Sequence, residues 1–175
     1  LSHIRNAPVP RSYFQHLEAG LRNSFTYKNV IGTRLGPVSG QDIVPLIADL
    51  LLRLERMSWS IVLGRCDGRL FVSIRTRNPR AHSGRLLRRV LGQRGSAGGH
   101  DMVAGGYIPL NGRSEKEIED LEDRLIRRFM AQVGHKEITN FDVLVSTGRT
   151  MPREEIPRTV AAEEPASSPP DAVGK

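Results

Sequence analysis

Two β-rich runs joined by an Asp-Gly pair constrain this chain more than any other feature. Residues 59–65 and 69–75 are rich in Ile, Val, Leu and Phe, and they flank Asp67 and Gly68. Asp-Gly readily adopts the positive φ angles of a tight hairpin turn, so the sequence predicts an antiparallel β-hairpin here. The first run is apolar at nearly every position, which is typical of a strand covered on both faces. We therefore expect the hairpin to lie at the centre of a β-sheet.

Four other segments have the periodicity of amphipathic helices, and three more resemble strands. The predicted helices span 10–25, 41–57, 82–93 and 114–134. The additional predicted strands span 27–36, 103–110 and 140–146. The order of these segments predicts an α/β domain, with a mixed β-sheet of about five strands flanked by helices.

Two helix starts and one buried face can be predicted in more detail. Asp42 is placed to cap the helix at 41–57, and Ser114 with Glu117 has the spacing of a capping box. The stripe of the helix at 41–57 that faces the core is predicted to consist of Ile43, Leu46, Ile47, Leu50 and Leu54.

Length and composition place the chain among single-domain proteins with a tail. The sequence has 175 residues, and residues 148–175 are rich in Pro, Ala, Glu and Ser, which predicts a disordered C-terminal tail. Cys66 is the only cysteine, so no internal disulfide can form, and we expect a reduced, cytoplasmic protein. No apolar run approaches the length of a membrane span. The chain does not begin with Met, and we expect it to be a fragment or a processed chain.

Charge is concentrated in one part of the sequence. The formal net charge is +7, and residues 75–94 contain seven arginines and no acidic residue. Such a run is usually a solvated surface, but arginine beside flexible backbone also favours partners that carry phosphate. Aromatic residues make up only 5% of the chain, which disfavours a broad platform for base stacking.

The most unusual stretch, GQRGSAGGHDMVAGG at 92–106, contains six glycines. We expect a loop, because glycine this dense destabilises regular structure. The pattern matches neither a Walker loop nor a dinucleotide fingerprint. Gly98 and Gly99 would allow successive N–H groups to point at an anion, and His100 could donate a hydrogen bond or a positive charge. A plain turn and a ligand-binding loop are both compatible with the pattern alone.

No complete active site can be assembled from the sequence. The five histidines show no metal-binding spacing, and there is no Gly-x-Ser-x-Gly motif. Arg75 ends the second hairpin strand, where its planar guanidinium would suit a phosphate. The alternative for this arginine is an ordinary solvated residue at the end of a strand. We expect no catalytic residue and no metal ligand in this chain.

The segments LFVSIRTR and GSAGGHDMVAGGYIP, with an arginine-rich helix between them, resemble the DHHA1 domain, the C-terminal half of DHH-superfamily phosphoesterases. The resemblance covers roughly residues 20–147. It departs from the family at Thr76, where a serine is frequent, and at Ser96 and Ala97, which interrupt the glycine run. It implies that residues 20–147 form the substrate-binding domain and that residues 1–19 are a linker or helix from a missing N-terminal DHH domain.

The resemblance also implies a function for the parent protein. Such proteins are Mn²⁺-dependent phosphoesterases that act on short oligonucleotides, nucleoside bisphosphates, cyclic-dinucleotide products or polyphosphate, and their metal lies in the N-terminal half. No Asp-His-His sequence occurs here, so we expect no cofactor in this chain. The residues expected to bind substrate phosphate are Arg75 and His100, the amides of Gly98 and Gly99, and more weakly Thr76, Arg77 and Ser96.

Two alternatives remain open at this stage. DHHA1 domains also occur outside phosphoesterases, as at the end of alanyl-tRNA synthetases, so the chain could be a stand-alone basic nucleic-acid-binding module. Such a module would spread its affinity over many arginines and lose it steeply with salt. In a third interpretation, the tail or the leucine-rich helix mediates a homodimer.

Overall fold

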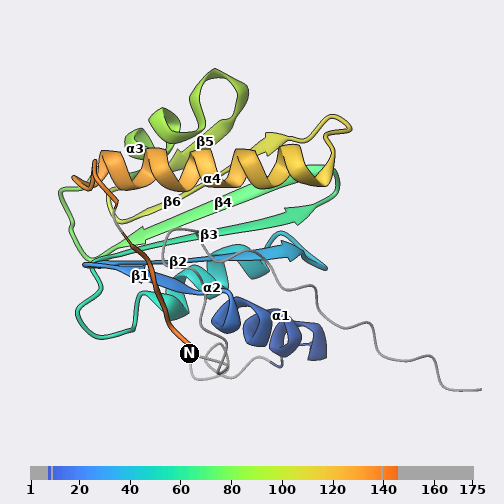
Figure 1. The fold of residues 1–175 in the computed structure, drawn as a ribbon, viewed down its shortest axis with the longest axis horizontal. Coiled ribbons are helices and arrows are strands. Elements are labelled where there is room, and N and C mark those ends of the chain that lie inside the picture. Colours follow the sequence, from blue (N-terminus) through green and yellow to red (C-terminus); the bar gives the residue numbers. More distant parts are fainter. Residues whose placement is uncertain (1–7, 9, 139, 146–175) are drawn as a thin grey trace, which may run out of the picture.

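The computed structural model describes residues 8, 10–138 and 140–145, and it shows a single sheet with helices on both faces (Figure 1). The predicted disordered tail at 148–175 lies outside the described residues. In chain order the elements are α1 (Arg11–Arg22), β1 (Phe25–Tyr27), β2 (Val30–Pro37), α2 (Ile43–Leu51), β3 (Trp59–Cys66), β4 (Arg69–Thr76), α3 (Ser83–Leu91), the short 3-10 helix η2 (Gly92–Arg94), β5 (Ser96–Gly99), β6 (Val103–Pro109), α4 (Glu115–Gln132) and β7 (Asp142–Val143).

The sheet is mixed, as predicted, but it has seven strands in the described part of the chain where about five were expected. The strand order is β5-β6-β4-β3-β2-β1-β7. β2 and β3 are parallel, and the other neighbouring pairs are antiparallel. Helices α1 and α2 cover one face, while α3 and α4 cover the other (Figure 1). The two additional strands, β1 and β5, have three and four residues, which is too short for an alternating pattern to identify a strand in the sequence.

The central hairpin confirms the strongest prediction. Asp67 and Gly68 have φ angles of 49° and 67°, the conformation that a two-residue turn requires. β3 is the fourth of the seven strands, and its alternate residues enter different cores. Ile61 and Leu63 pack on the side of α3 and α4, whereas Val62 packs on the side of α1 and α2. The strand is apolar throughout because both of its faces are covered.

The helix termini were predicted better than the face of α2. The capping box of α4 is present, with the Ser114 hydroxyl accepting a hydrogen bond from the Glu117 N–H. Asp42 stands at the N-cap of α2, but its side chain makes no capping hydrogen bond. Leu46, predicted to be buried, is 46% exposed. The residues that are buried are Ile43, Val44, Ile47, Ala48 and Leu51. α2 is apolar on nearly all sides, so the sheet rather than the periodicity decides which face it buries.

The N-terminal helix crosses the predicted domain boundary. α1 is continuous through residue 20, and Phe25, which was assigned to this helix, belongs to β1. A Cβ atom on Gly20 would lie 2.9 Å from Leu35 Cδ2, so the end of α1 packs directly on β2. That residues 1–19 derive from another domain stays a prediction.

The glycine-rich stretch is where the sequence-based prediction was wrong. Its first part forms η2 and the edge strand β5 rather than a loop, and β5 pairs antiparallel with β6, the strand that was predicted at 103–110. The glycines allow close approach of neighbouring segments. A Cβ atom on Gly106 would lie 2.4 Å from the Ser96 carbonyl oxygen, and one on Gly99 would lie 2.3 Å from the Val103 carbonyl oxygen. Side chains at these positions would push the strands apart.

None of the helices in the described part of the chain combines the length and apolarity needed to cross a membrane.

Candidate functional site

Arg75 is the most strongly positioned of the predicted site residues. It lies near the end of β4 and is only 8% exposed. Its Nε donates a 2.5 Å hydrogen bond to Asp49 Oδ1 of α2, and its Nη1 donates to Ser73 Oγ at 2.7 Å and to the Ile74 carbonyl at 3.0 Å. Nη2 makes no hydrogen bond within the described residues. The guanidinium is therefore held in a fixed orientation with one nitrogen available to a ligand.

The two residues that follow Arg75 are held in the local structure. The Thr76 hydroxyl donates to the Ser58 carbonyl at 2.8 Å and accepts from the Asn78 N–H, so it closes the turn after β4. The side chain of Arg77 is exposed, and its Nη2 donates to the Leu52 carbonyl at 2.8 Å, just beyond the end of α2. Both side chains have protein partners, so Arg75 is the residue of this segment with the clearest capacity for a ligand.

Gly98 and Gly99 lie in β5, where Gly98 pairs with Gly105 and Gly99 with Ala104. In an extended strand, successive N–H groups point to opposite edges, so the amides of both glycines cannot converge on one anion in this conformation. Space beside Gly98 is open, because a Cβ atom there would meet nothing within 4 Å. Ser96 stands at the other end of β5, about 10 Å along the strand from Gly99.

His100 follows β5 in the tight turn that leads into β6. Its N–H donates to the Val103 carbonyl at 2.8 Å, and its carbonyl accepts from the Gly84 N–H at the start of α3. The next residue also contacts α3, because the Asp101 carbonyl accepts from the Ser83 hydroxyl at 2.7 Å. These contacts fix the turn against the N-terminus of α3. The His100 imidazole itself is exposed and makes no hydrogen bond within the described part of the chain.

Two separate hollows, each of about 230 Å³, contain these residues. Arg75 lines the hollow on the α2 side, with Gln41, Ser73 and Gly105 among its neighbours. His100 lines the hollow on the α3 side, and the other lining residues there are His82, Gly84, Arg85, Arg88, Gly99 and Asp101. The structure therefore does not place the two side chains in one cavity.

Val103 contacts the neighbourhoods of both Arg75 and His100. It pairs with Arg75 across β4 and β6, and its carbonyl accepts the His100 N–H. Val103 and the adjacent Met102 are 44% and 45% exposed. Arg75 and His100 thus lie at the same end of the sheet, on either side of an exposed strand end.

Sequence reasoning missed the residues that support this end of the sheet. Asp49 and Ser73 orient Arg75 through hydrogen bonds to its guanidinium. His82 caps α3 with a left-handed conformation, and its Nδ1 lies 3.1 Å from Asp101 Oδ1. No local sequence pattern links Arg75 to Asp49 or His82 to Asp101. Arg85 and Arg88, which line the hollow of His100, could have been predicted as site residues from their place in the arginine-rich helix.

The described residues do not fit a resident metal ion. No three His, Cys, Asp or Glu side chains within the described ranges are grouped so that they could hold one. Arg85 and Arg88 line the hollow of His100, and the guanidinium of Arg75 lines the other hollow, so both hollows offer groups that suit an anion. We therefore derive no step through Mn²⁺ from the residues of this chain.

Together these observations define an α/β domain in which Arg75 and His100 lie at one end of the sheet and line two hollows. The model of the DHHA1 domain family matches residues 28–133, which is more than half of the chain. The chain therefore belongs to the DHHA1 family, and the resemblance seen in its sequence is confirmed.

This chain matches only part of each of three similar proteins. An uncharacterized protein of Methanocaldococcus jannaschii is 29% identical over 143 residues, which are 78% of this chain and 29% of that protein. The chain thus spans less than a third of this relative. The crystal structure of an exopolyphosphatase-related protein from Bacteroides fragilis matches with a TM-score of 0.51 and 17% identity, over 72% of this chain and 37% of the other. A pGpG-specific phosphodiesterase from Vibrio cholerae matches with a TM-score of 0.45 and 18% identity, over 69% and 41%.

Proposed function

We propose that this chain is the substrate-binding domain of a DHH-type phosphoesterase, and that it binds a phosphate of a short oligonucleotide or nucleotide at the sheet end between Arg75 and His100. Membership of the DHHA1 family supports this proposal. The observation that carries it is the buried guanidinium of Arg75, which Asp49 and Ser73 hold with Nη2 left open. Bond cleavage would be performed by a DHH half in cis, which would supply Mn²⁺.

The proposed role of these residues is to bind and orient the substrate. Arg75 Nη2 would donate to a non-bridging phosphate oxygen, and because its other nitrogens are already bonded, little entropy is lost on binding. His100 would donate a hydrogen bond when neutral and add a positive charge when protonated. Since the two side chains line different hollows, they would contact the substrate at two points on either side of Val103. Such contacts would fix the phosphodiester for attack.

The test compares a fluorescently labelled RNA dinucleotide with and without a terminal phosphate, using fluorescence anisotropy. The wild-type protein is expected to bind the phosphorylated dinucleotide more tightly. A hydrogen bond to a charged group contributes about 1.5–3 kcal/mol, so His100→Ala should reduce this affinity at least about tenfold. Arg80→Gln is the control, because Arg80 is an exposed arginine of the same basic run whose side chain has no partner among the described residues.

The outcome also separates the two classes of function. Loss of the phosphate-dependent gain in His100→Ala, with the gain retained in Arg80→Gln, supports a substrate-binding domain. Equal affinities for both dinucleotides in all three proteins would refute it. That result would favour the general nucleic-acid-binding module.

A further inference from the structure

The hollow that contains Arg75 has features that the proposed phosphate contact does not use. It lies between the start of α2 and the strands β4 and β6, and its apolar walls are formed by Val44, Pro45, Phe71 and Val103. Its volume of about 230 Å³ is smaller than the roughly 300–1,000 Å³ of pockets that enclose a whole drug-sized ligand. The hollow therefore suits one part of a larger ligand.

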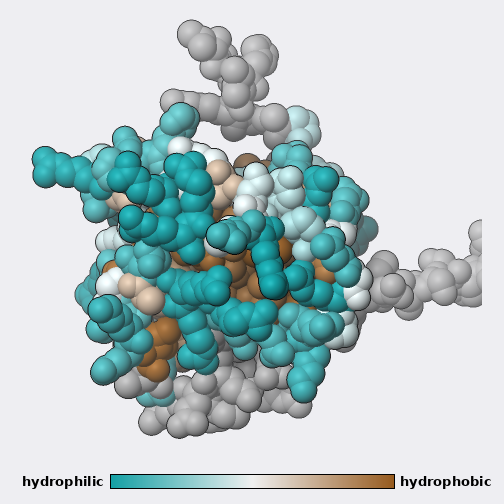
Figure 2. All heavy atoms as spheres, turned by 90° about the horizontal axis from the view of Figure 1, so that it is seen from above, coloured by the Kyte–Doolittle hydropathy of each residue, from teal (hydrophilic) through white to brown (hydrophobic). Residues whose placement is uncertain are grey.

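Exposed apolar side chains gather around this hollow. Val103 lines it, and Leu46 and Met102, which are chain neighbours of lining residues, are exposed as well. On the face shown in Figure 2, by contrast, hydrophilic residues predominate. A group of exposed apolar side chains that is bordered by polar residues, here Asp42 and Arg75, marks a surface that contacts a ligand or a partner.

Glycine residues form part of the floor of the hollow. Gly105 of β6 lines it and is paired with Ser73 of β4 on one side and with Gly98 of β5 on the other. Among the described residues, a Cβ atom on Gly105 would meet only the Val72 carbonyl oxygen, at 4.0 Å, and one on Gly98 would meet nothing within 4 Å. Close packing within the chain therefore does not require glycine at these two positions. Without side chains, the two strands offer a flat backbone surface on which a planar ring can lie.

Two charged side chains line the hollow with hydrogen-bonding groups still available to a ligand. The side chain of Arg75 is 9% exposed, and its Nη2 is the open donor described above. The Asp42 carboxylate does not cap α2 and has no partner among the described residues. Asp49, which holds Arg75, follows Asp42 by seven residues, so the two aspartates are separated by about 10 Å along α2. The sugar of a nucleotide separates its phosphate from the far edge of its base by a similar length.

We propose that the hollow beside Arg75 binds a guanine base of the substrate and that Asp42 selects this base. The proposal rests on the proposed function, because it takes the phosphate of the same nucleotide to lie on Arg75 Nη2. Guanine presents its N1–H and N2–H groups side by side, and an ionised carboxylate accepts both. Adenine presents an acceptor in place of N1–H, which repels a carboxylate, and cytosine offers a single amino group. The side-chain amide of Gln41, which also lines the hollow, would donate to guanine O6.

The test is isothermal titration calorimetry of the full chain with unlabelled RNA dinucleotides: pGpG, pApA and pCpC, which carry a 5′-terminal phosphate, and GpG, which lacks it. A bidentate contact discriminates against the wrong base by on the order of 10- to 100-fold, so the wild type should prefer pGpG to pApA by this factor. Asp42→Asn retains a good N-cap residue and should abolish the preference, chiefly by weakening the binding of pGpG. Gly105→Leu, for which the backbone leaves space, should fill the hollow and weaken pGpG binding at least about tenfold.

Asp142→Asn is the matched control, because Asp142 is an exposed aspartate of β7, at the opposite edge of the sheet from β5. It should keep the guanine preference, and circular dichroism should show that all three variants are folded. Equal affinities of the wild type for pGpG, pApA and pCpC would overturn the proposal, and so would a guanine preference that survives in Asp42→Asn or in Gly105→Leu. A guanine preference in the wild type with equal affinities for pGpG and GpG would support the base site and refute the proposed role of the terminal phosphate, so the two failures can be told apart.

Discussion

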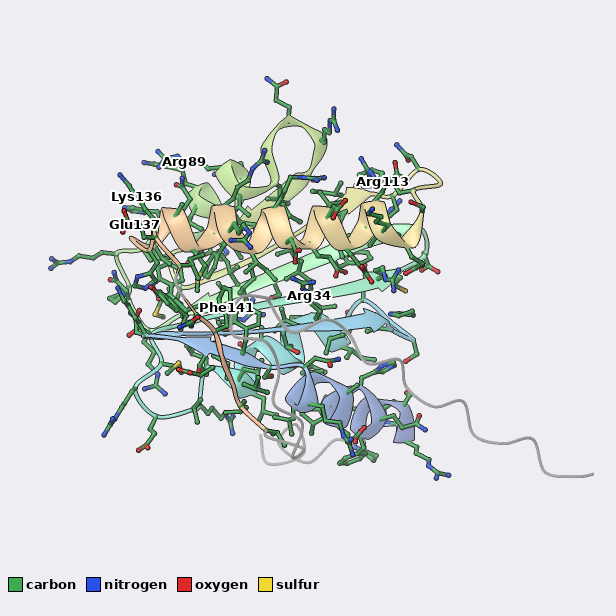
Figure 3. The ribbon with its side chains drawn as sticks, in the orientation of Figure 1. Arg34, Arg89, Arg113, Lys136, Glu137 and Phe141 are labelled. Carbon is green, nitrogen blue, oxygen red and sulfur yellow. The ribbon has the colours of Figure 1, made fainter. Side chains whose placement is uncertain are left out.

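Glu122 provides the prediction that can be worked out furthest from the structure. This residue of α4 is 3% exposed and faces Arg34 of β2, which is 1% exposed. Arg34 lies between the layer of α4 and that of α1 and α2 (Figure 3). The two are not in ideal contact, since Arg34 Nε lies 3.9 Å from Glu122 Oε2, and Arg34 Nη2 instead donates to Asp123. Burial raises the pKa of Glu122 from 4.5 to about 7, although Arg34 and Arg65 oppose the rise, while Asp123 and Glu119 add to it.

The raised pKa implies a definite dependence of stability on pH. Because Glu122 binds its proton more tightly in the folded chain than in the unfolded one, its contribution is fully present below about pH 4.5 and is lost as the pH rises through about 7. A difference of one pH unit between the two pKa values corresponds to about 1.4 kcal/mol, so the loss is at most about 3 kcal/mol. Glu122→Gln mimics the protonated acid and should remove this dependence.

Urea denaturation of the wild type and of Glu122→Gln at pH 5 and pH 8 measures the effect. The two proteins should be similar at pH 5, and at pH 8 the variant should be the more stable by up to about 3 kcal/mol. The competing view is that a buried ion pair with Arg34 dominates, in which case removing one partner costs about 3–5 kcal/mol. A variant that is less stable than the wild type at pH 8 would refute the reasoning. So would a difference that does not change with pH.

Two further predictions concern the edge of the sheet and the start of α4. Gly106→Ala should lower the free energy of unfolding by about 1–3 kcal/mol, because its Cβ atom would lie 2.4 Å from the Ser96 carbonyl oxygen. Gly98→Ala, whose Cβ atom would lie in open space, should change the free energy of unfolding by less than about 1 kcal/mol. Equal effects of the two substitutions in thermal or urea unfolding would contradict the close-approach explanation. Ser114→Ala should cost about 1 kcal/mol through loss of the capping box, and an unchanged unfolding midpoint would show that the cap is not stabilising.

The central part of the fold could be predicted because local rules and tertiary structure agree there. The turn at Asp67 and Gly68 requires positive φ angles, and the continuous apolar run before it requires two covered faces, so each feature has one structural solution. The capping box of α4 is similarly local. The prediction of the buried face of α2 was wrong, because a helix with apolar residues on nearly all sides has no sequence pattern that indicates which side is buried.

The loop prediction for the glycine-rich stretch was wrong for a different reason. High glycine content indicates freedom of the backbone, but it also permits strands and helices to approach each other closely, and sequence alone does not separate these causes. The requirement appears only when α3 and β5 are seen together: a Cβ atom on Gly84 would lie 2.6 Å from the Gly99 carbonyl oxygen. For the site, the sequence predicted that Arg75 and His100 would act together, yet it could not show that Asp49 holds Arg75 or that two hollows flank Val103.

The most direct test of the account is to map where a phosphorylated dinucleotide binds, using ¹H–¹⁵N chemical-shift perturbation on the labelled chain. The proposed function predicts that the largest shifts fall at the end of the sheet, in residues 75–77 and 98–105, and that they shrink when the terminal phosphate is removed. Shifts confined to α3 and α4, or shifts that are the same with and without the phosphate, would contradict it.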